Sequence, residues 1–323
     1  MKSLITGGAG FIGSHLAERL LNDGKEVVVL DNLSTGSWQN IAALKGRKGF
    51  ESVIGSVRDQ SLVIELMEQC DIAIHLAAAV GVKLVLDRPS HSIHTNVNGT
   101  ENVLHAAASQ NKLVFIASSS EVYGKSAQSA FNEADDLVLG STSNLRWSYA
   151  IAKALDECLA LAYNQENRVP VIIGRLFNTT GPGQTGRYGM VLPGFVTQAV
   201  QNQPITVYGT GEQSRCFAHV YDIVESIIRL IEKPEAVGQV FNIGNDEEIS
   251  INELAEFVKT AANSQSEILK LEYNDVYSAG FEEMQRRKPD LSKLEKYIGY
   301  RPRTPLSTIV DDVIAEKRAT LNL

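Results

Sequence analysis

A glycine-rich turn near the start of the chain restricts the fold more than any other feature of the sequence. Residues 7–13 read Gly-Gly-Ala-Gly-Phe-Ile-Gly, which fits both G-x-G-x-x-G and G-x-x-G-x-x-G. An apolar run at 4–6 precedes the turn, and an amphipathic stretch at 11–21 follows it. Glycines between a strand and a helix let backbone N–H groups approach a phosphate at the helix N-terminus. The pattern predicts a dinucleotide site that uses Gly7, Gly10, Phe11, Ile12 and Gly13.

Strand-like and helix-like patterns alternate through the first half of the chain. Short apolar runs without alternation are typical of strands that are covered on both faces. We expect such strands at 26–30, 52–54, 72–76, 113–117 and 170–173, and helices at 98–109 and 149–164. This order predicts an α/β fold with a Rossmann-type doubly wound parallel sheet.

The pattern changes after Arg175. Residues 178–190 are rich in Gly and Thr and are expected to form a long loop. We expect strands at 205–207 and 240–242, the latter in the main sheet, and helices at 221–231, 251–262, 291–298 and 307–318. The prediction is therefore a dinucleotide-binding domain of residues 1–175 and about 219–243, and a smaller C-terminal substrate-binding domain of about 176–218 and 244–323.

Charge and cysteine content exclude several classes of function. The formal net charge is −8, which disfavours nucleic acid or an anionic membrane as a general partner. Cys70, Cys158 and Cys216 are few and lack metal-ligand spacing, which is typical of a reducing compartment. Polar residues interrupt every apolar stretch, and the first residues lead directly into a predicted strand. We expect a cytoplasmic protein without a membrane span, a signal peptide or a metal site.

The end of the second predicted strand indicates which dinucleotide binds. Asp31 lies there, where a carboxylate accepts hydrogen bonds from the adenosine ribose and repels a 2′-phosphate. No Arg or Lys follows in residues 32–38, so the predicted cofactor is NAD rather than NADP. Asp59 has two interpretations: a partner of the adenine amino group, or the N-cap of the next helix.

Tyr149 and Lys153 are the first candidates for catalysis. They are four residues apart in a predicted helix, and therefore on one face. A lysine ammonium beside a phenol lowers the pKa of the phenol, so that a phenolate can accept a proton from a sugar hydroxyl. The strand at 113–117 leads into Ser118, Ser119 and Ser120, at the edge of the sheet where ligands bind.

These motifs together resemble the extended short-chain dehydrogenase/reductases, the NAD-dependent epimerase/dehydratase family. The resemblance is carried by GGAGFIGSHL, DNLSTG, HLAA, NVNGT, SSSEVYG, YAIAK and RLFNTTGPG, and extends over essentially the whole chain. It implies an enzyme, commonly a homodimer, that acts on a nucleotide sugar through a 4-keto intermediate. It also implies the following roles: catalysis by Ser119, Tyr149 and Lys153, cofactor binding by Asn32, Leu76, Ala77, Ala78, Tyr149 and Lys153, and binding of the substrate diphosphate by Asn178 and Arg215.

Two segments resemble the UDP-glucuronate decarboxylases within that family. The first is Ser-Glu-Val-Tyr-Gly at 120–124, in which Glu121 would be the acid that protonates C5 after CO₂ is lost. The second is Tyr-Ser-Ala-Gly-Phe at 277–281 followed by Arg286–Asp290, in which Arg287 would bind the anionic substrate. The alternative for this basic stretch is a solvated turn. The prediction is UDP-glucuronate decarboxylation to UDP-xylose or its 4-keto form.

Other functions remain open. The Val-Gly-Val-Lys loop at 80–83 is more similar to epimerases and dehydratases, so a UDP-sugar 4-epimerase of the UDP-glucose/UDP-galactose type is the alternative. A 4,6-dehydratase is disfavoured because Ser120 stands where those enzymes have Asp. A non-catalytic sensor of NAD and sugar nucleotides would not need Ser119, Tyr149 and Lys153. Tyr208 is expected either to stack on a uracil or to be an ordinary core aromatic.

Overall fold

The computed structural model describes residues 1–186, 190–273 and 282–322. Seven parallel strands form the main sheet in the order β11-β6-β5-β4-β1-β2-β3. Their bounds are β1 Lys2–Thr6, β2 Glu26–Asp31, β3 Phe50–Ile54, β4 Ile72–His75, β5 Leu113–Ser119, β6 Val171–Leu176 and β11 Gln239–Ile243. The order reverses at β1 and β4, and such a switch point is where doubly wound sheets bind ligands.

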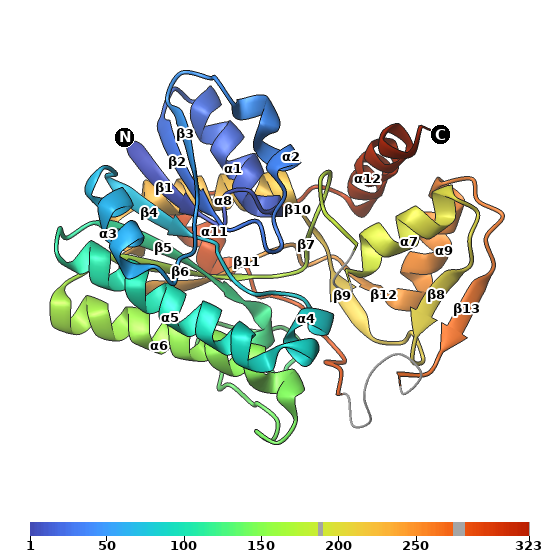
Figure 1. Cartoon of the computed structure of the whole chain (residues 1–323). Coiled ribbons are helices and arrows are strands. Elements are labelled where there is room, and N and C mark those ends of the chain that lie inside the picture. The colour runs from blue at the N-terminus through green and yellow to red at the C-terminus, as the bar shows by residue number, and fades with distance from the viewer. Residues whose placement is uncertain (187–189, 274–281, 323) are drawn as a thin grey trace.

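Helices cover both faces of this sheet (Figure 1), which confirms the predicted fold class. One face packs against α1 (Phe11–Asn22), α2 (Trp38–Ile41), α8 (Val220–Ile231) and α11 (Ser292–Ile298). The other face packs against α3 (Gln60–Glu68), α5 (Pro89–Ala108) and α6 (Ser148–Asn167). Buried strands such as β2, with four consecutive buried residues, need this cover on both sides.

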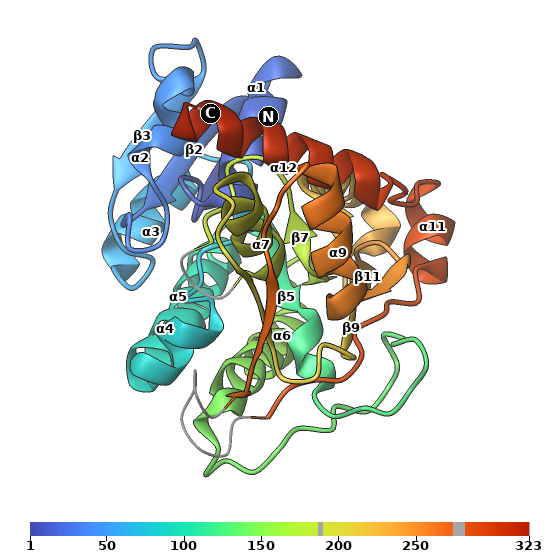
Figure 2. The same cartoon turned by 90° about the vertical axis from the view of Figure 1, so that its right-hand side faces the viewer.

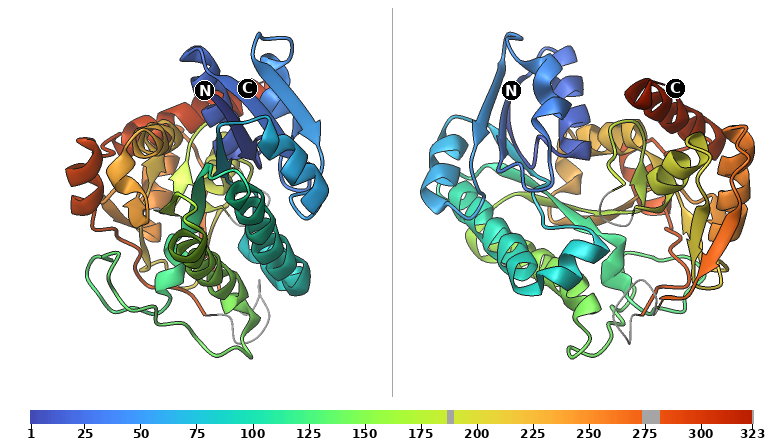
Figure 3. Two further views of the ribbon diagram at one scale, coloured as in Figure 1. Left: turned by 90° about the vertical axis from the view of Figure 1, so that its left-hand side faces the viewer. Right: turned by 45° about the vertical axis from the view of Figure 1, so that its right-hand side comes forward.

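A second hydrophobic core lies beside the main sheet. It is built mainly from α7 (Val191–Val200), β8 (Ile205–Tyr208), α9 (Ile251–Ala261) and α12 (Leu306–Leu321). Figure 2 shows α12 lying across α7 and α9, and Figure 3 shows this part to one side of the N-terminal part. Three small sheets complete it: β7 (Thr179–Thr180) with β10 (Ala218–His219), β9 (Ser214–Cys216) with β12 (Glu248–Ser250), and β8 with β13 (Ile268–Leu271).

The remaining elements are short. They are α4 (Val82–Asp87) and the 3₁₀ turns η1 (Ala42–Leu44), η2 (Ser120–Tyr123), η3 (Leu145–Trp147) and η4 (Pro234–Ala236). In the part of the chain that the structure describes, no helix has the length and apolarity needed to cross a bilayer.

The elements expected from the sequence are present, with three informative differences. Helix α5 begins at Pro89 rather than 98, because its polar first half still buries Ser92 and Asn96. Helix α7 was not expected, because Pro193 and Gly194 interrupt its pattern. Helix α11 packs on the main sheet beside Phe241, although it lies within 244–323.

Candidate active site

The glycine turn between β1 and α1 forms a cradle with no room for side chains. Gly7 has a φ of +71°, and a Cβ there would lie 2.7 Å from the backbone nitrogen of Ala77. A Cβ on Gly13 would lie 2.4 Å from the carbonyl oxygen of Gly7. The backbone N–H of Gly10 donates to that carbonyl at 3.0 Å. This close backbone at a helix N-terminus is the arrangement that receives a pyrophosphate, so the residues present fit NAD.

Asp31 stands next to this turn, at the end of β2. Its carboxylate accepts hydrogen bonds from the backbone N–H groups of Ala9 at 3.0 Å and Leu33 at 2.7 Å. Burial raises the pKa of Asp31, and these backbone hydrogen bonds oppose the rise. The bonds hold the carboxylate beside the glycine turn, where the ribose of a dinucleotide is expected.

The other residues expected at the cofactor lie around the same sheet edge. Asn32 accepts from the backbone N–H of Ser34 in a local turn. Asp59 accepts from the N–H of Leu62 at 3.1 Å, so it is the N-cap of α3. Leu76, Ala77 and Ala78 directly follow β4, and the N–H groups of Leu76 and Ala77 bond to Thr6. Phe11 and Ile12 open α1 and are partly buried.

Tyr149 and Lys153 share the buried face of α6, as the spacing predicts. Ser119, at the end of β5, hydrogen-bonds Tyr149 and accepts from the backbone N–H of Glu121 at 3.2 Å. Lys153 Nζ donates to Asp156 Oδ2 at 3.1 Å. Burial and the Glu121 carboxylate raise the pKa of Tyr149, while the bond to Ser119 opposes the rise. The direction is thus opposite to that expected from the sequence, because burial of the phenol is the largest cause and the Glu121 carboxylate adds to it.

Glu121 lies between two arginines from distant parts of the chain. Its Oε2 accepts from Arg146 Nη1 at 2.6 Å, and its Oε1 lies 3.6 Å from Arg287 Nη1. Burial raises the pKa of Glu121, but the charges of Arg146 and Arg287 outweigh burial and leave that pKa below its ordinary value. Glu121 is therefore a carboxylate in this structure.

A second ion pair extends this group of charges. Arg215 Nη2 donates to Glu283 Oε1 at 2.9 Å, and Arg146 Nη2 lies 4.0 Å from the same oxygen. Three guanidinium groups and two carboxylates leave one excess positive charge. A site of this kind favours an anionic ligand, because the ligand relieves repulsion among the arginines.

The segment that carries Arg287 is held against the main domain rather than solvated. A β-bridge joins Pro289 to Phe131, and Asn242 Nδ2 donates to the carbonyl of Asp290. Arg287 Nε donates to Ser120 Oγ at 3.2 Å. Its neighbour Arg286 is exposed and pairs with Glu248. Residues 277–281, the first part of the decarboxylase-like segment, lie outside the described residues. The described part of the chain resumes at residue 282.

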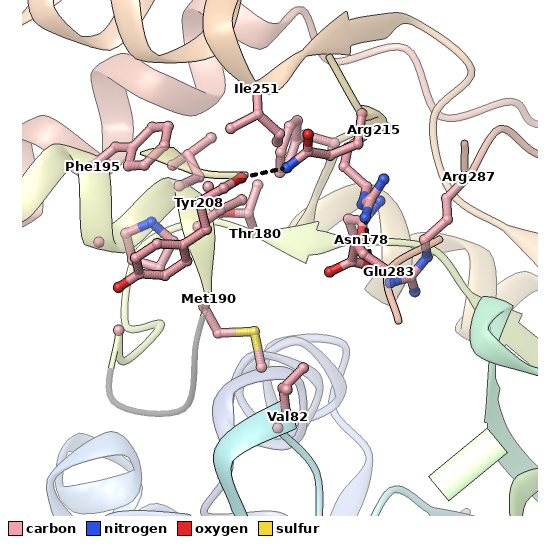
Figure 4. Close-up of a pocket in the computed structure, with 18 of the residues that line it drawn as sticks. Val82, Asn178, Thr180, Met190, Phe195, Tyr208, Arg215, Ile251, Glu283 and Arg287 are labelled. Carbon is pink, nitrogen blue, oxygen red and sulfur yellow. Dashed lines mark hydrogen bonds and ion pairs between the residues drawn. The ribbon is translucent and has the colours of Figure 1, made fainter. Parts of the chain in front are cut away.

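A cavity of about 390 Å³ connects these groups. Tyr149, Glu121, Arg146 and Arg287 line it. Figure 4 shows Arg215, Arg287 and Glu283 together at one end, and Tyr208 and Phe195 towards the other. Asn178, which was expected to bind the diphosphate, also lines the cavity, and its amide donates to the carbonyl of Cys216. Val80, Gly81 and Val82 of the epimerase-like loop are in the lining as well.

The sequence did not identify three charged residues of this region. Arg146 was not singled out, although it lies three residues before Tyr149 and lines the same cavity. Glu283 and Asp156 have no local signal. Within the described residues, no three His, Cys, Asp or Glu side chains are grouped so that they could hold a metal ion.

Comparison with known proteins agrees with this site. Residues 3–244 match the sequence profile of the NAD dependent epimerase/dehydratase family. The chain belongs to this family. The family is that predicted from the motifs, and its cofactor is NAD.

Relatives of this family with similar sequence include two decarboxylases. The UDP-N-acetyl-alpha-D-glucosaminuronate decarboxylase of Bacillus cytotoxicus is 42% identical over 302 residues, which cover 93% of this chain and 92% of that protein. UDP-glucuronic acid decarboxylase 1 of Xenopus tropicalis is 35% identical, over 94% of this chain and 69% of that protein. A solved UDP-glucuronic acid 4-epimerase of Bacillus cereus, in complex with UDP-glucuronic acid and NAD, superposes with a TM-score of 0.89 at 26% identity, covering 99% of this chain and 100% of that one.

Proposed function

We propose that this protein is an NAD-dependent decarboxylase of UDP-hexuronates, with UDP-glucuronate as substrate and UDP-xylose or its 4-keto form as product. The observation that carries the proposal is the position of Glu121, which lies two residues after the end of β5 and is bound by Arg146 and close to Arg287. The names of the two decarboxylase relatives support it. The 2-acetamido form of the substrate is a second candidate, favoured by the relative that is 42% identical.

The charges of the pocket support an anionic sugar. Arg215 and Asn178 would bind the diphosphate, and Tyr208 would contact the uracil; all three line the cavity. A hexuronate adds a carboxylate at C6, which would compete with Glu121 for Arg146 and Arg287. That competition would loosen Glu121 from the arginines and raise its pKa, because a second carboxylate close by disfavours ionisation. Glu121 could then carry the proton that C5 requires.

The reaction follows from these positions. Tyr149 accepts the proton of the sugar O4 hydroxyl, with Ser119 bonded to the phenol and Lys153 on the same helix face. NAD held at the glycine turn would supply the acceptor for the C4 hydride and, where UDP-xylose rather than its 4-keto form is the product, the donor that restores it. The resulting 4-ketone makes the C6 carboxylate a β-keto acid, so the C5–C6 bond breaks to release CO₂ and its electron pair enters an enolate. Glu121 then protonates C5.

A UDP-sugar 4-epimerase is the second candidate function. The similarity of the solved epimerase and the epimerase-like Val80–Lys83 loop, part of which lines the cavity, favour it. An epimerase needs only room for the 4-keto sugar to turn over before the hydride returns. A 4,6-dehydratase is less favoured because it needs an acid where this chain has Ser120.

A set of parallel incubations distinguishes these functions. The purified enzyme is supplied with NAD and, in separate reactions, with UDP-glucuronate, its 2-acetamido form, UDP-glucose and UDP-galactose, and products are identified by mass spectrometry and NMR. Loss of CO₂ from a hexuronate without added reductant is the expected result. Interconversion of C4 epimers with an intact carboxylate would establish the epimerase instead. A protein that binds NAD and the sugars but never forms NADH or a product would be the sensor.

The organisation of the enzyme is also part of the proposal. We infer that residues 1–175 and about 219–243 bind NAD, and that about 176–218 and 244–323 bind the nucleotide sugar. We propose a homodimer, supported by the exposed apolar side chains of Ile93 on α5 and of Leu155 and Leu161 on the adjacent α6. A cytoplasmic location and the absence of nucleic-acid partners are supported by the cysteine content and by the net charge of −8.

A further inference from the structure

Asp156 is a buried carboxylate bonded to Lys153. It lies one helical turn after Lys153 on the face of α6 that packs into the protein, and its side chain is 0% exposed. Oδ2 accepts from Lys153 Nζ at 3.1 Å. Oδ1 is buried and has no hydrogen-bond partner among the residues that the structure describes. A helix interior disfavours Asp, and a buried unpaired oxygen is destabilising, so packing alone does not account for this residue.

The surroundings leave Asp156 as the carboxylate that balances Lys153. Other ionisable groups lie near this part of α6 or Tyr149: Glu157 on α6 itself, and His75, Glu121, Arg175 and Arg287 on neighbouring elements. Burial and the nearby Lys153 lower the pKa of His75 to about 3, so the imidazole is neutral at ordinary pH. Glu157 and Arg175 pair with each other at 2.8 Å. Glu121 is paired with Arg146 at 2.6 Å.

We propose that Asp156 is a positioning residue that holds the ammonium of Lys153 as its counter-ion and thereby sets the pH at which Tyr149 gives up its proton. A fixed negative charge favours the protonated form of a group near it. It therefore keeps the phenol of Tyr149 protonated to higher pH, and the charge of Asp156 does raise the Tyr149 pKa. The inference rests on the proposed catalytic roles of Tyr149 and Lys153, and not on which sugar is the substrate.

The variant Asp156→Asn removes the charge and keeps the shape. In the pH profile of kcat/KM, the acidic limb reports deprotonation of Tyr149. That limb is expected to move to lower pH by about one unit, as for loss of one nearby charge. A residue that only supports the fold would lower the rate equally at every pH and leave the limb in place.

A second measurement needs no turnover. The phenolate of Tyr149 is titrated by ultraviolet difference absorbance, as the difference between a protein and the same protein carrying Tyr149→Phe. The midpoint is expected at lower pH with Asp156→Asn than without it. Because no substrate is present, this result stands even if the proposed decarboxylation is wrong. An unshifted midpoint together with an unshifted acidic limb in folded Asp156→Asn protein would overturn the inference.

The controls separate charge from helix damage. Glu166→Gln removes a carboxylate from the exposed face of the same helix and is expected to leave the acidic limb and the phenol midpoint unchanged. Asp156→Ser is smaller and also uncharged, and it is used if Asp156→Asn does not fold. It is expected to give the same shift to lower pH. Asp156→Glu keeps the charge and is expected to keep the acidic limb near that of the native enzyme.

Discussion

The carboxylate of Glu121 lies 2.6 Å from the guanidinium of Arg146, in a turn that immediately precedes the helix of Tyr149. Arg287 approaches the same carboxylate from the C-terminal part of the chain. The proposed acid is thus held ionised by two cations that would also attract a substrate carboxylate. The following predictions test that relationship and the rest of the site.

Glu121→Gln is expected to slow decarboxylation more than it slows reduction of NAD. The amide keeps the shape but has no proton to give to C5, and loss of a general acid typically costs about 10²- to 10⁴-fold in rate. In single turnovers NADH should form and persist, and the sugar protonated at C5 should appear only slowly after it. Equal slowing of NAD reduction and of decarboxylation would contradict the assignment of Glu121 as the proton donor.

Arg146→Gln is expected to lower kcat/KM for UDP-glucuronate by on the order of 10- to 100-fold, the value of one charge-assisted hydrogen bond. Reduction of NAD by neutral UDP-glucose should change much less, because it has no carboxylate to bind. The comparison of the two substrates is the measurement. A similar loss with both would mean that Arg146 acts through the fold or the diphosphate.

Tyr149→Phe is expected to leave the fold and NAD binding intact and to remove most turnover, by about 10²- to 10⁴-fold. The proposal assigns removal of the O4 proton to the phenolic oxygen of Tyr149, which is bonded to Ser119. Circular dichroism and calorimetric titration with NAD serve as controls for folding and cofactor binding. Turnover close to that of the native enzyme would exclude the proposed base.

NAD is expected to bind far more tightly than NADP. The Asp31 carboxylate is fixed beside the glycine turn by Ala9 and Leu33, and the loop at 32–38 offers no Arg or Lys for a 2′-phosphate. Calorimetric titration of cofactor-stripped protein measures both affinities. Asp31→Ser should narrow the difference between the affinities for NAD and NADP. Equal affinities in the native protein would contradict the assignment of NAD as the cofactor.

Arg175→Ala is expected to lower the free energy of unfolding by about 3–5 kcal/mol, because it leaves Glu157 charged and buried without its partner. Arg175 Nε and Nη2 donate to the two oxygens of Glu157 at 3.0 and 2.8 Å. The matched control is Arg286→Ala, which breaks the more exposed pair with Glu248 and should cost at most about 1 kcal/mol. Urea unfolding of both variants gives the comparison.

Much of the fold could be predicted from local patterns. The strands of the main sheet, the glycine turn after β1 and the shared face of Tyr149 and Lys153 follow from short stretches of sequence, since backbone hydrogen bonding and side-chain period depend mainly on neighbouring residues. The elements that were missed, such as α7 with its Pro193 and Gly194, have weak local patterns and owe their structure to packing.

By itself, then, the sequence determined the Rossmann-type sheet, the family and the residues at which chemistry was expected. Only the tertiary structure decided how those residues are charged. Arg146 and Arg287 are far apart in the chain, and their meeting at Glu121 depends on the β-bridge that joins Phe131 to Pro289. The ionisation of Glu121 and Tyr149 depends on burial and on the charges a few ångströms away, which are properties of the folded arrangement and have no counterpart in sequence spacing.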